Sequence, residues 1–183
     1  MGYGIVLVLK KTFEDSASYE GRVAYAKRFK QMTKDPGGDM EDITYIEHFS
    51  EEYDEVQLEV EDDYDVDFYP NLIRVWTPLQ WWTFFDYDSI PGSIRKLFQR
   101  LIDVIQPEDC WIGTDYATDQ TCEAEVGYEK WIETIRETYG QIQDFDFDSV
   151  FENLKQETWP EEIYHVKDNN LYKSGFVGET QKN

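Results

Sequence analysis

Basic residues are scarce in this sequence. Its 183 residues contain 17 Lys and Arg against 39 Asp and Glu, which gives a formal net charge of −22. Residues 35–73 contain no Lys or Arg but 15 Asp and Glu, whereas the first 34 residues contain seven bases. A charge of this sign and size repels phosphates, which excludes nucleic acid and anionic membranes as direct partners. A cationic protein surface is the natural complement.

Cysteines and long apolar runs are also few. The two cysteines, Cys110 and Cys122, are close enough in sequence to pair, although two cysteines in a chain of this size are more typical of reduced residues. The apolar run at residues 5–9 ends at two lysines, so it is too short for a signal sequence or a membrane span. We therefore expect a cytoplasmic protein.

Motifs that specify a metal, a cofactor or a nucleophile are missing. A calcium loop beginning at Asp63 requires Gly at its sixth position and Glu at its twelfth, where this chain has Phe68 and Arg74. The acidic series beginning at Asp144 fails the same test. No Gly-x-Ser-x-Gly occurs, and the two histidines and two cysteines lack the paired spacing of a zinc finger. We expect no catalytic residue, no bound metal and no cofactor.

The chain does contain enough apolar material for a folded core. Hydrophobic residues make up 40% and aromatic residues 16%, which a disordered acidic tail would not have. The run IVLVL at residues 5–9 predicts a strand buried on both faces. Residues 19–34 predict a helix with Val23, Ala26 and Phe29 on its inner face. Its outer face is then basic, formed by Arg22, Lys27, Arg28, Lys30 and Lys34.

Further elements follow from hydrophobic periodicity. Val56, Leu58 and Val60 alternate with polar residues, which predicts a strand at 55–60 with one face on the core. Residues 72–76 predict its antiparallel neighbour across an acidic loop. The remaining predicted elements are a strand or short helix at 43–49, helices at 91–105 and 128–139, a strand at 110–113, a short helix capped by Asp148 and ending at 154, and a strand at 162–166.

This mixed order of strands and helices predicts the α+β class. We expect a single mixed or mostly antiparallel sheet with helices packed against it, on one face. Residues 1–168 are expected to form one globular α+β domain. The polar residues 169–183 are expected to form a flexible C-terminal tail.

Aromatic residues are interspersed with the acidic residues of the base-free segment. Tyr53, Tyr64 and Tyr69 have mostly charged neighbours in the sequence, which predicts that their rings are exposed. Such rings provide contact area at low entropic cost, and carboxylates pair with Arg and Lys. The predicted partner-binding residues are Glu51, Glu52, Tyr53, Asp54, Glu55, Glu59, Asp62, Asp63, Tyr64, Asp65, Asp67 and Tyr69.

These features favour a non-enzymatic acidic binding protein of the immunity-protein or toxin-inhibitor kind. It would neutralise a basic protein, such as a nuclease-type toxin, by occluding a cationic active or nucleic-acid-binding site. Two alternatives stay open: a phage-type nucleic-acid mimic that inhibits a defence or transcription protein, and a small carboxylate-dependent hydrolase. The Trp81 and Trp82 pair is a candidate surface for a homodimer.

Overall fold

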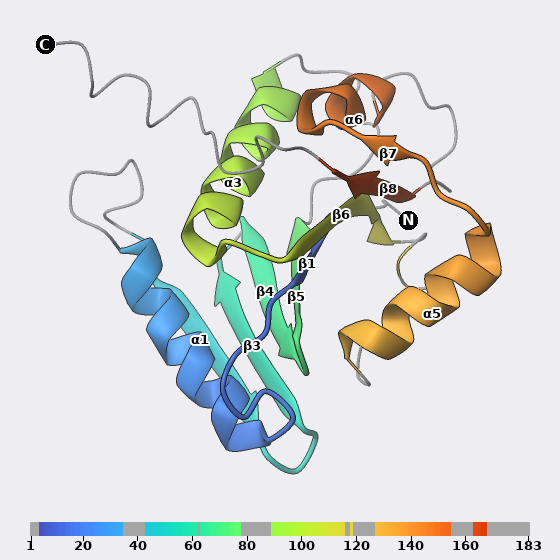
Figure 1. Cartoon of the computed structure of the whole chain (residues 1–183). Coiled ribbons are helices and arrows are strands. Elements are labelled where there is room, and N and C mark those ends of the chain that lie inside the picture. The colour runs from blue at the N-terminus through green and yellow to red at the C-terminus, as the bar shows by residue number, and fades with distance from the viewer. Residues whose placement is uncertain are drawn as a thin grey trace, which may run out of the picture.

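The computed structural model describes residues 4–34, 43–61, 63–77, 89–115, 118, 127–154 and 163–167. Within them, eight strands form one sheet in the order β2-β3-β4-β5-β1-β6-β8-β7, and helices pack against it (Figure 1). Neighbouring strands are antiparallel except for the parallel pair β7 and β8. The predicted α+β class with a mostly antiparallel sheet is confirmed.

The strands and helices have the following bounds. The strands are β1 (Ile5–Lys10), β2 (Tyr45–Ser50), β3 (Glu55–Val60), β4 (Tyr64–Tyr69), β5 (Leu72–Thr77), β6 (Asp109–Thr114), β7 (Asp144–Phe145) and β8 (Ile163–Val166). The helices are α1 (Tyr19–Thr33), α3 (Ser89–Ile105), α5 (Tyr128–Tyr139) and α6 (Phe147–Leu154). Residues 43–49, which fitted either a strand or a helix, therefore lie largely in the strand β2.

The central strand β1 has its five apolar side chains buried on both faces of the sheet. Ile5, Leu7 and Leu9 face one apolar cluster, and Val6 and Val8 face another. All five are at most 2% exposed, because β1 pairs with β5 on one side and β6 on the other. The predicted two-sided burial of this strand is confirmed.

The two faces of the sheet are covered by different helices. Side chains of α1, α3 and α6 pack into the cluster that contains Leu7, whereas α5 packs with Val8 on the opposite face. Figure 1 shows α5 across the sheet from α1 and α3. The prediction that all helices lie on one face is wrong. Because β1 is apolar on both faces, the apolar stripe of α5, centred on Trp131, has a second surface on which to pack.

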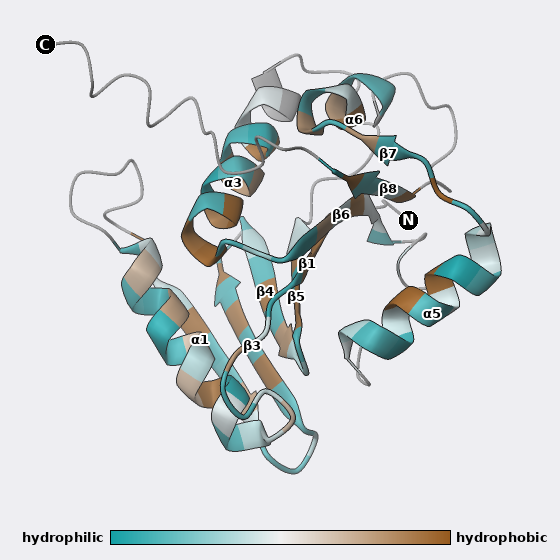
Figure 2. Cartoon of the chain, viewed as in Figure 1, coloured by the Kyte–Doolittle hydropathy of each residue, from teal (hydrophilic) through white to brown (hydrophobic). Residues whose placement is uncertain are grey.

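The predicted acidic loop after β3 is in fact the strand β4. Tyr64, Val66 and Phe68 are at most 2% exposed and face the core, while the aspartates between them face away. β4 pairs with β3 on one side and with β5 on the other, so β3 and β5 are not direct neighbours. Figure 2 shows the same alternation of brown and teal residues along β3.

Two further predictions about helices need correction. Arg22 is 2% exposed and lies on the buried side of α1, with its guanidinium turned toward the β2–β3 turn. The helix α6 is capped by Asp146, whose Oδ1 accepts a hydrogen bond from the Ser149 N–H at 2.9 Å, and Asp148 lies in the first turn. Asp146 and Asp148 are both favourable N-cap residues, so the sequence alone does not decide which of them caps the helix.

Some predictions concern residues outside the described ranges. These are the Trp81 and Trp82 pair, Cys122 and its pairing with Cys110, Asp62, and the tail at 169–183.

Candidate partner-binding surface

The outward face of β3 and β4 carries five of the twelve predicted binding residues, namely Glu55, Glu59, Asp65, Asp67 and Tyr69. Val56, Leu58 and Val60 are buried at 3%, 0% and 8% exposure, so Glu55, Gln57 and Glu59 point to the other side of the sheet. The predicted alternation in β3 is therefore confirmed. On β4 the corresponding outward residues are Asp65, Asp67 and Tyr69.

Two carboxylates lie directly opposite each other on this face. Glu59 of β3 pairs in register with Asp65 of β4. The ring of His48 on β2 is 2.6 Å from Glu59, and within the described residues no Lys or Arg forms an ion pair with Glu59 or Asp65. Partial burial and the carboxylates of Asp67 and Glu59 together raise the pKa of Asp65 above its usual range.

The neighbouring row of the same face is neutralised internally. Asp67 accepts a hydrogen bond from Gln57 Nε2 at 2.8 Å and one from Arg74 Nε at 2.9 Å. These three residues face one another in register across β3, β4 and β5. Asp67 is only 6% exposed and both its oxygens are engaged, so it supports the surface from within rather than presenting a free charge.

The turn between β2 and β3 is held by a buried arginine. Arg22 Nη1 donates to the carbonyl oxygens of Ser16 and Ala17, and Nη2 forms an ion pair with the Asp54 carboxylate. Asp54 has a φ of 52°, a left-handed conformation that Asp tolerates better than most residues. This anchoring fixes the turn, from which Tyr53 projects with 75% of its surface exposed.

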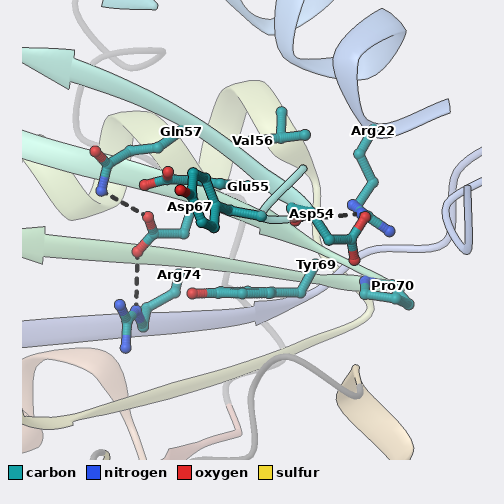
Figure 3. A pocket seen from close by; sticks show the side chains of 10 residues that line it. Arg22, Asp54, Glu55, Val56, Gln57, Asp67, Tyr69, Pro70 and Arg74 are labelled. Carbon is teal, nitrogen blue, oxygen red and sulfur yellow. Dashed lines mark hydrogen bonds and ion pairs between the residues drawn. The ribbon is translucent and has the colours of Figure 1, made fainter. Parts of the chain in front are cut away.

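A polar cavity of about 320 Å³ lies where this turn meets the β4–β5 turn (Figure 3). Carboxylates, two arginines and two tyrosine rings line it, together with Gln57. The guanidinium carbon of Arg74 lies 5.8 Å from the centre of the Tyr69 ring, a cation–π distance. The full lining is Arg22, Tyr53, Asp54, Glu55, Val56, Gln57, Asp67, Tyr69, Pro70 and Arg74.

The structure brings some of the predicted binding residues together and separates others. Five of them, Tyr53, Asp54, Glu55, Asp67 and Tyr69, line the cavity. Glu59 and Asp65 form the adjacent carboxylate pair, and Glu51, Glu52 and Asp63 are exposed in the two turns that flank β3.

Of the three predicted aromatic anchors, only Tyr53 is fully exposed. Tyr69 is half-buried. Tyr64 is 2% exposed, and its hydroxyl lies 3.0 Å from that of Tyr45, so the prediction that it is exposed is wrong. The residue faces the core because it begins β4 in phase with Val66 and Phe68.

The sequence missed the cationic part of the cavity. Arg22 and Arg74 are distant in sequence from the carboxylates they bind, and Gln57 meets Asp67 only through strand pairing. The alternation of Tyr64, Val66 and Phe68 was the signal for a strand at this position. Pairing of that strand with its two neighbours would have placed Gln57, Asp67 and Arg74 in one row.

The chain has no match among protein-family models, curated proteins or solved structures. Within the part that the structure describes, no group of three or more His, Cys, Asp and Glu side chains is arranged to hold a metal ion. No helix in the described ranges is long and apolar enough to cross a membrane.

A second polar cluster, unforeseen in the sequence, lies on the α5 face of the sheet. His165 Nδ1 is 2.7 Å from Asp144 and its Nε2 is 2.5 Å from Asp109, which also accepts a hydrogen bond from the Tyr128 hydroxyl. The hydrogen bond to Asp109 is the main reason why the pKa of His165 is raised. Burial acts to raise the pKa of Asp109, but the hydrogen bonds from His165 and Tyr128 outweigh it and lower that pKa.

This arrangement clamps β6, β7 and β8 together and leaves neither ring nitrogen of His165 open to a substrate. The Cys110 thiol lies on the other face of the sheet, fully buried, where desolvation raises its pKa. Cys110 and His165 therefore do not form a nucleophile–base pair.

Proposed function

We propose that the chain is a non-enzymatic binding protein that neutralises a basic protein, as an immunity protein or toxin inhibitor does. The surface formed by the outward side chains of β3 and β4 and by the β2–β3 turn would cover a cationic active or nucleic-acid-binding site of that partner. The observation that carries the proposal is the pairing of Glu59 with Asp65. Like charges directly opposite each other on neighbouring strands destabilise a sheet.

A cationic partner removes this cost. A Lys or Arg placed between Glu59 and Asp65 converts repulsion within the free protein into two ion pairs in the complex. Burial is the main reason why the pKa of Asp65 is raised, and the carboxylates of Asp67 and Glu59 add to it. The net charge of −22 adds long-range attraction, which speeds the encounter with a basic protein.

The cavity beside this pair supplies the second part of the contact. Tyr53 is exposed at the turn and Glu55 is exposed beside it, next to a preformed wall that consists of Tyr69, Arg74 and Asp67. Aromatic residues at the centre of a contact and polar residues at its rim are typical of interfaces in which a few side chains contribute most of the affinity. Binding by occlusion requires no chemistry from this chain, and we propose that it acts in the cytoplasm.

Affinity capture at low and moderate salt tests this function. The tagged protein is expected to retain one stoichiometric basic protein from its host's lysate at about 50 mM salt and to release it as salt rises, since screening weakens the charge attraction. The captured protein is then assayed for its own activity with and without the chain. A captured nuclease that is inhibited supports the proposal, whereas a defence or transcription protein displaced from DNA would favour the nucleic-acid mimic.

Charge reversal locates the contact. The triple variant Glu59→Lys, Asp63→Lys, Asp65→Lys should weaken binding of the captured protein at least about a hundredfold, because attraction becomes repulsion at the centre of the surface. A matched triple reversal at Glu129, Glu133 and Glu137, all exposed on α5, changes the net charge equally. Equal losses in the two variants would show that only net charge matters and would contradict the proposed surface.

A further inference from the structure

The strand β2 forms one edge of the sheet. Within the described residues it pairs with β3 on one side and has no strand neighbour on the other. Its sequence, YIEHFS, contains no Pro and no Lys, the two residues with which natural proteins most often protect an edge strand against pairing. Six residues in extended conformation are long enough to template another strand.

Apolar exposure is concentrated at the same place. In the described part of the chain, the large hydrophobic residues that are exposed are Ile46, at 41%, and Tyr53, at 75%. Ile46 lies on β2 in register with Glu59, and Tyr53 lies in the turn that follows β2. An exposed apolar side chain beside the carboxylate pair suits a partner that contacts both.

The two sides of this edge differ in charge. On the outward side, Ile46 is followed across the sheet by Glu59 and Asp65, and His48 is followed by Gln57 and Asp67. On the helix side, Glu47 of β2 is already paired with Lys30 of α1 at 2.5 Å. On one face, a strand added to β2 would therefore continue the row of Ile46, Glu59 and Asp65, in which the ring of His48 contacts Glu59 and no described Lys or Arg pairs with either carboxylate. On the other face it would meet the neutralised pair of Glu47 and Lys30.

We infer that the basic partner binds by adding a β-strand to the free edge of β2, with basic side chains at alternate positions on the face that continues the Glu59 and Asp65 row. This inference rests on the proposed function and specifies its binding mode. Main-chain hydrogen bonds supply affinity in this mode, and alternate side chains supply specificity. A second copy of this chain is a poor occupant, because it would bring another net charge of −22 to the same edge.

A synthetic strand tests the inference without knowledge of the natural partner. The probe is a ten-residue peptide of alternating Lys and Thr, compared with the same peptide N-methylated at alternate residues, in both phases. All three peptides carry the same charge, but N-methylation removes the amide donors that strand pairing needs. We expect the parent peptide to slow hydrogen exchange of β2 amides, and we expect one N-methylated phase to bind at least about tenfold more weakly.

Proline substitutions on the protein provide the matched pair. The N–H groups of Glu47 and His48 point to opposite sides of β2, so one faces β3 and the other the free edge. Proline at the β3-facing position should disturb the sheet, whereas proline at the edge-facing position should leave the fold intact and abolish the protection by the peptide.

Three results would overturn strand addition: no binding of the Lys peptide, equal binding of the parent and both N-methylated peptides, or concentration-dependent protection of β2 without peptide. The last result would make a second copy the occupant. None of them bears on the charge-reversal comparison, so the proposed function can stand when the strand-addition mode fails.

Discussion

Asp65 is the residue at which stability and the proposed binding are most directly opposed. Its carboxylate faces Glu59 across the strand pair and is partly buried, and its pKa is raised. An acid whose pKa is higher in the folded than in the unfolded state binds more protons when folded. Its charge therefore destabilises the folded protein at neutral pH, and this cost disappears as pH falls below the unfolded value of about 3.9.

Asp65→Asn is therefore expected to stabilise the free protein. We expect a gain of about 0.5–1 kcal/mol in the free energy of unfolding at pH 7.5, because the charge is no longer partly buried or repelled by Asp67 and Glu59. Urea unfolding at pH 7.5 and at pH 3.5 checks this, since the gain should vanish at the lower pH. Asp63→Asn, in the exposed turn, is the control and should change stability little. A loss of stability in Asp65→Asn at pH 7.5 would contradict this account.

His165 gives the opposite pH dependence. Its pKa is raised by hydrogen bonds to Asp109 and Asp144, with Tyr128 and Lys167 completing the charged and titratable surroundings. A histidine whose pKa is raised on folding contributes fully below its unfolded value of about 6.5, and the contribution is lost as pH rises through the folded value. Because the pKa of Asp109 is lowered on folding, its carboxylate stabilises the folded protein in full above about pH 4, the usual value for an unfolded chain.

His165→Gln should consequently cost most in mildly acidic solution. We expect a loss of about 1–3 kcal/mol between pH 4 and 6.5, and a smaller loss at higher pH, as the wild-type ring loses its proton. Urea unfolding across this pH series measures the difference. His48→Gln, on the exposed face of β2, serves as the control. A cost for His165→Gln that is independent of pH would mean that the ring acts by packing on Trp111 alone.

At the scale of elements, the docking of α5 depends on a glycine. Gly127 has a φ of +90°, and a Cβ at this position would lie 2.5 Å from the carbonyl oxygen of Pro70 in the β4–β5 turn. The N–H of the next residue, Tyr128, donates to that same oxygen at 3.1 Å. The start of α5 is thus held close to the edge of the candidate surface.

Gly127→Ala and Gly140→Ala form a matched pair at the two ends of α5. Both glycines have positive φ, which costs an alanine about 1–3 kcal/mol, but a Cβ at Gly140 would meet no neighbouring atom. We expect Gly127→Ala to be the more destabilising of the two by about 1–3 kcal/mol, because it adds a steric clash. Urea unfolding of both variants checks this. Equal costs would show that the β4–β5 turn moves away freely.

The sequence predicted some of the strands and helices correctly and missed others. Strong local patterns predicted β1, β3, α3 and α5: a continuous apolar run for β1, strict alternation for β3 and an apolar stripe for each of the two helices. β4 was missed because its outward aspartates dominate its composition, although Tyr64, Val66 and Phe68 keep the period of a strand. The packing face of α5 and the burial of Arg22 depend on residues distant in sequence, so no local pattern contains them.

The same distinction applies to the candidate surface. Acidic and aromatic composition predicted a binding segment from Glu51 to Tyr69, but the cavity depends on Arg22 and Arg74, which strand pairing and helix packing bring to it. Composition predicts the charge of a surface, whereas its shape depends on which strands are neighbours.

For the whole molecule, the dominant electrostatic effect is self-repulsion. Seventeen basic residues do not offset 39 acidic ones. Raising NaCl from about 10 mM to about 200 mM shortens the Debye length from about 30 Å to about 7 Å. We expect the Tm to rise by about 3 °C or more, because screening relieves repulsion that is strongest in the compact state.

Calorimetry or circular dichroism at a series of salt concentrations measures this rise. KCl should act like NaCl, since screening depends on ionic strength rather than on the cation. A Tm that falls with salt would show that the internal ion pairs, such as Arg22 with Asp54, outweigh the repulsion.

The position of β1 in the sheet has a consequence during protein synthesis. β1 lies between β5 and β6, whose paired residues follow it by 62 to 109 positions in the chain. At ribosomal rates of roughly 5–20 residues per second, the run IVLVL waits about 5–20 s before both of its neighbours exist. A short, uncharged, β-branched segment left unpaired for that time is prone to aggregate. Nascent chains of this protein should therefore need a chaperone at this strand until the residues of β6 have emerged.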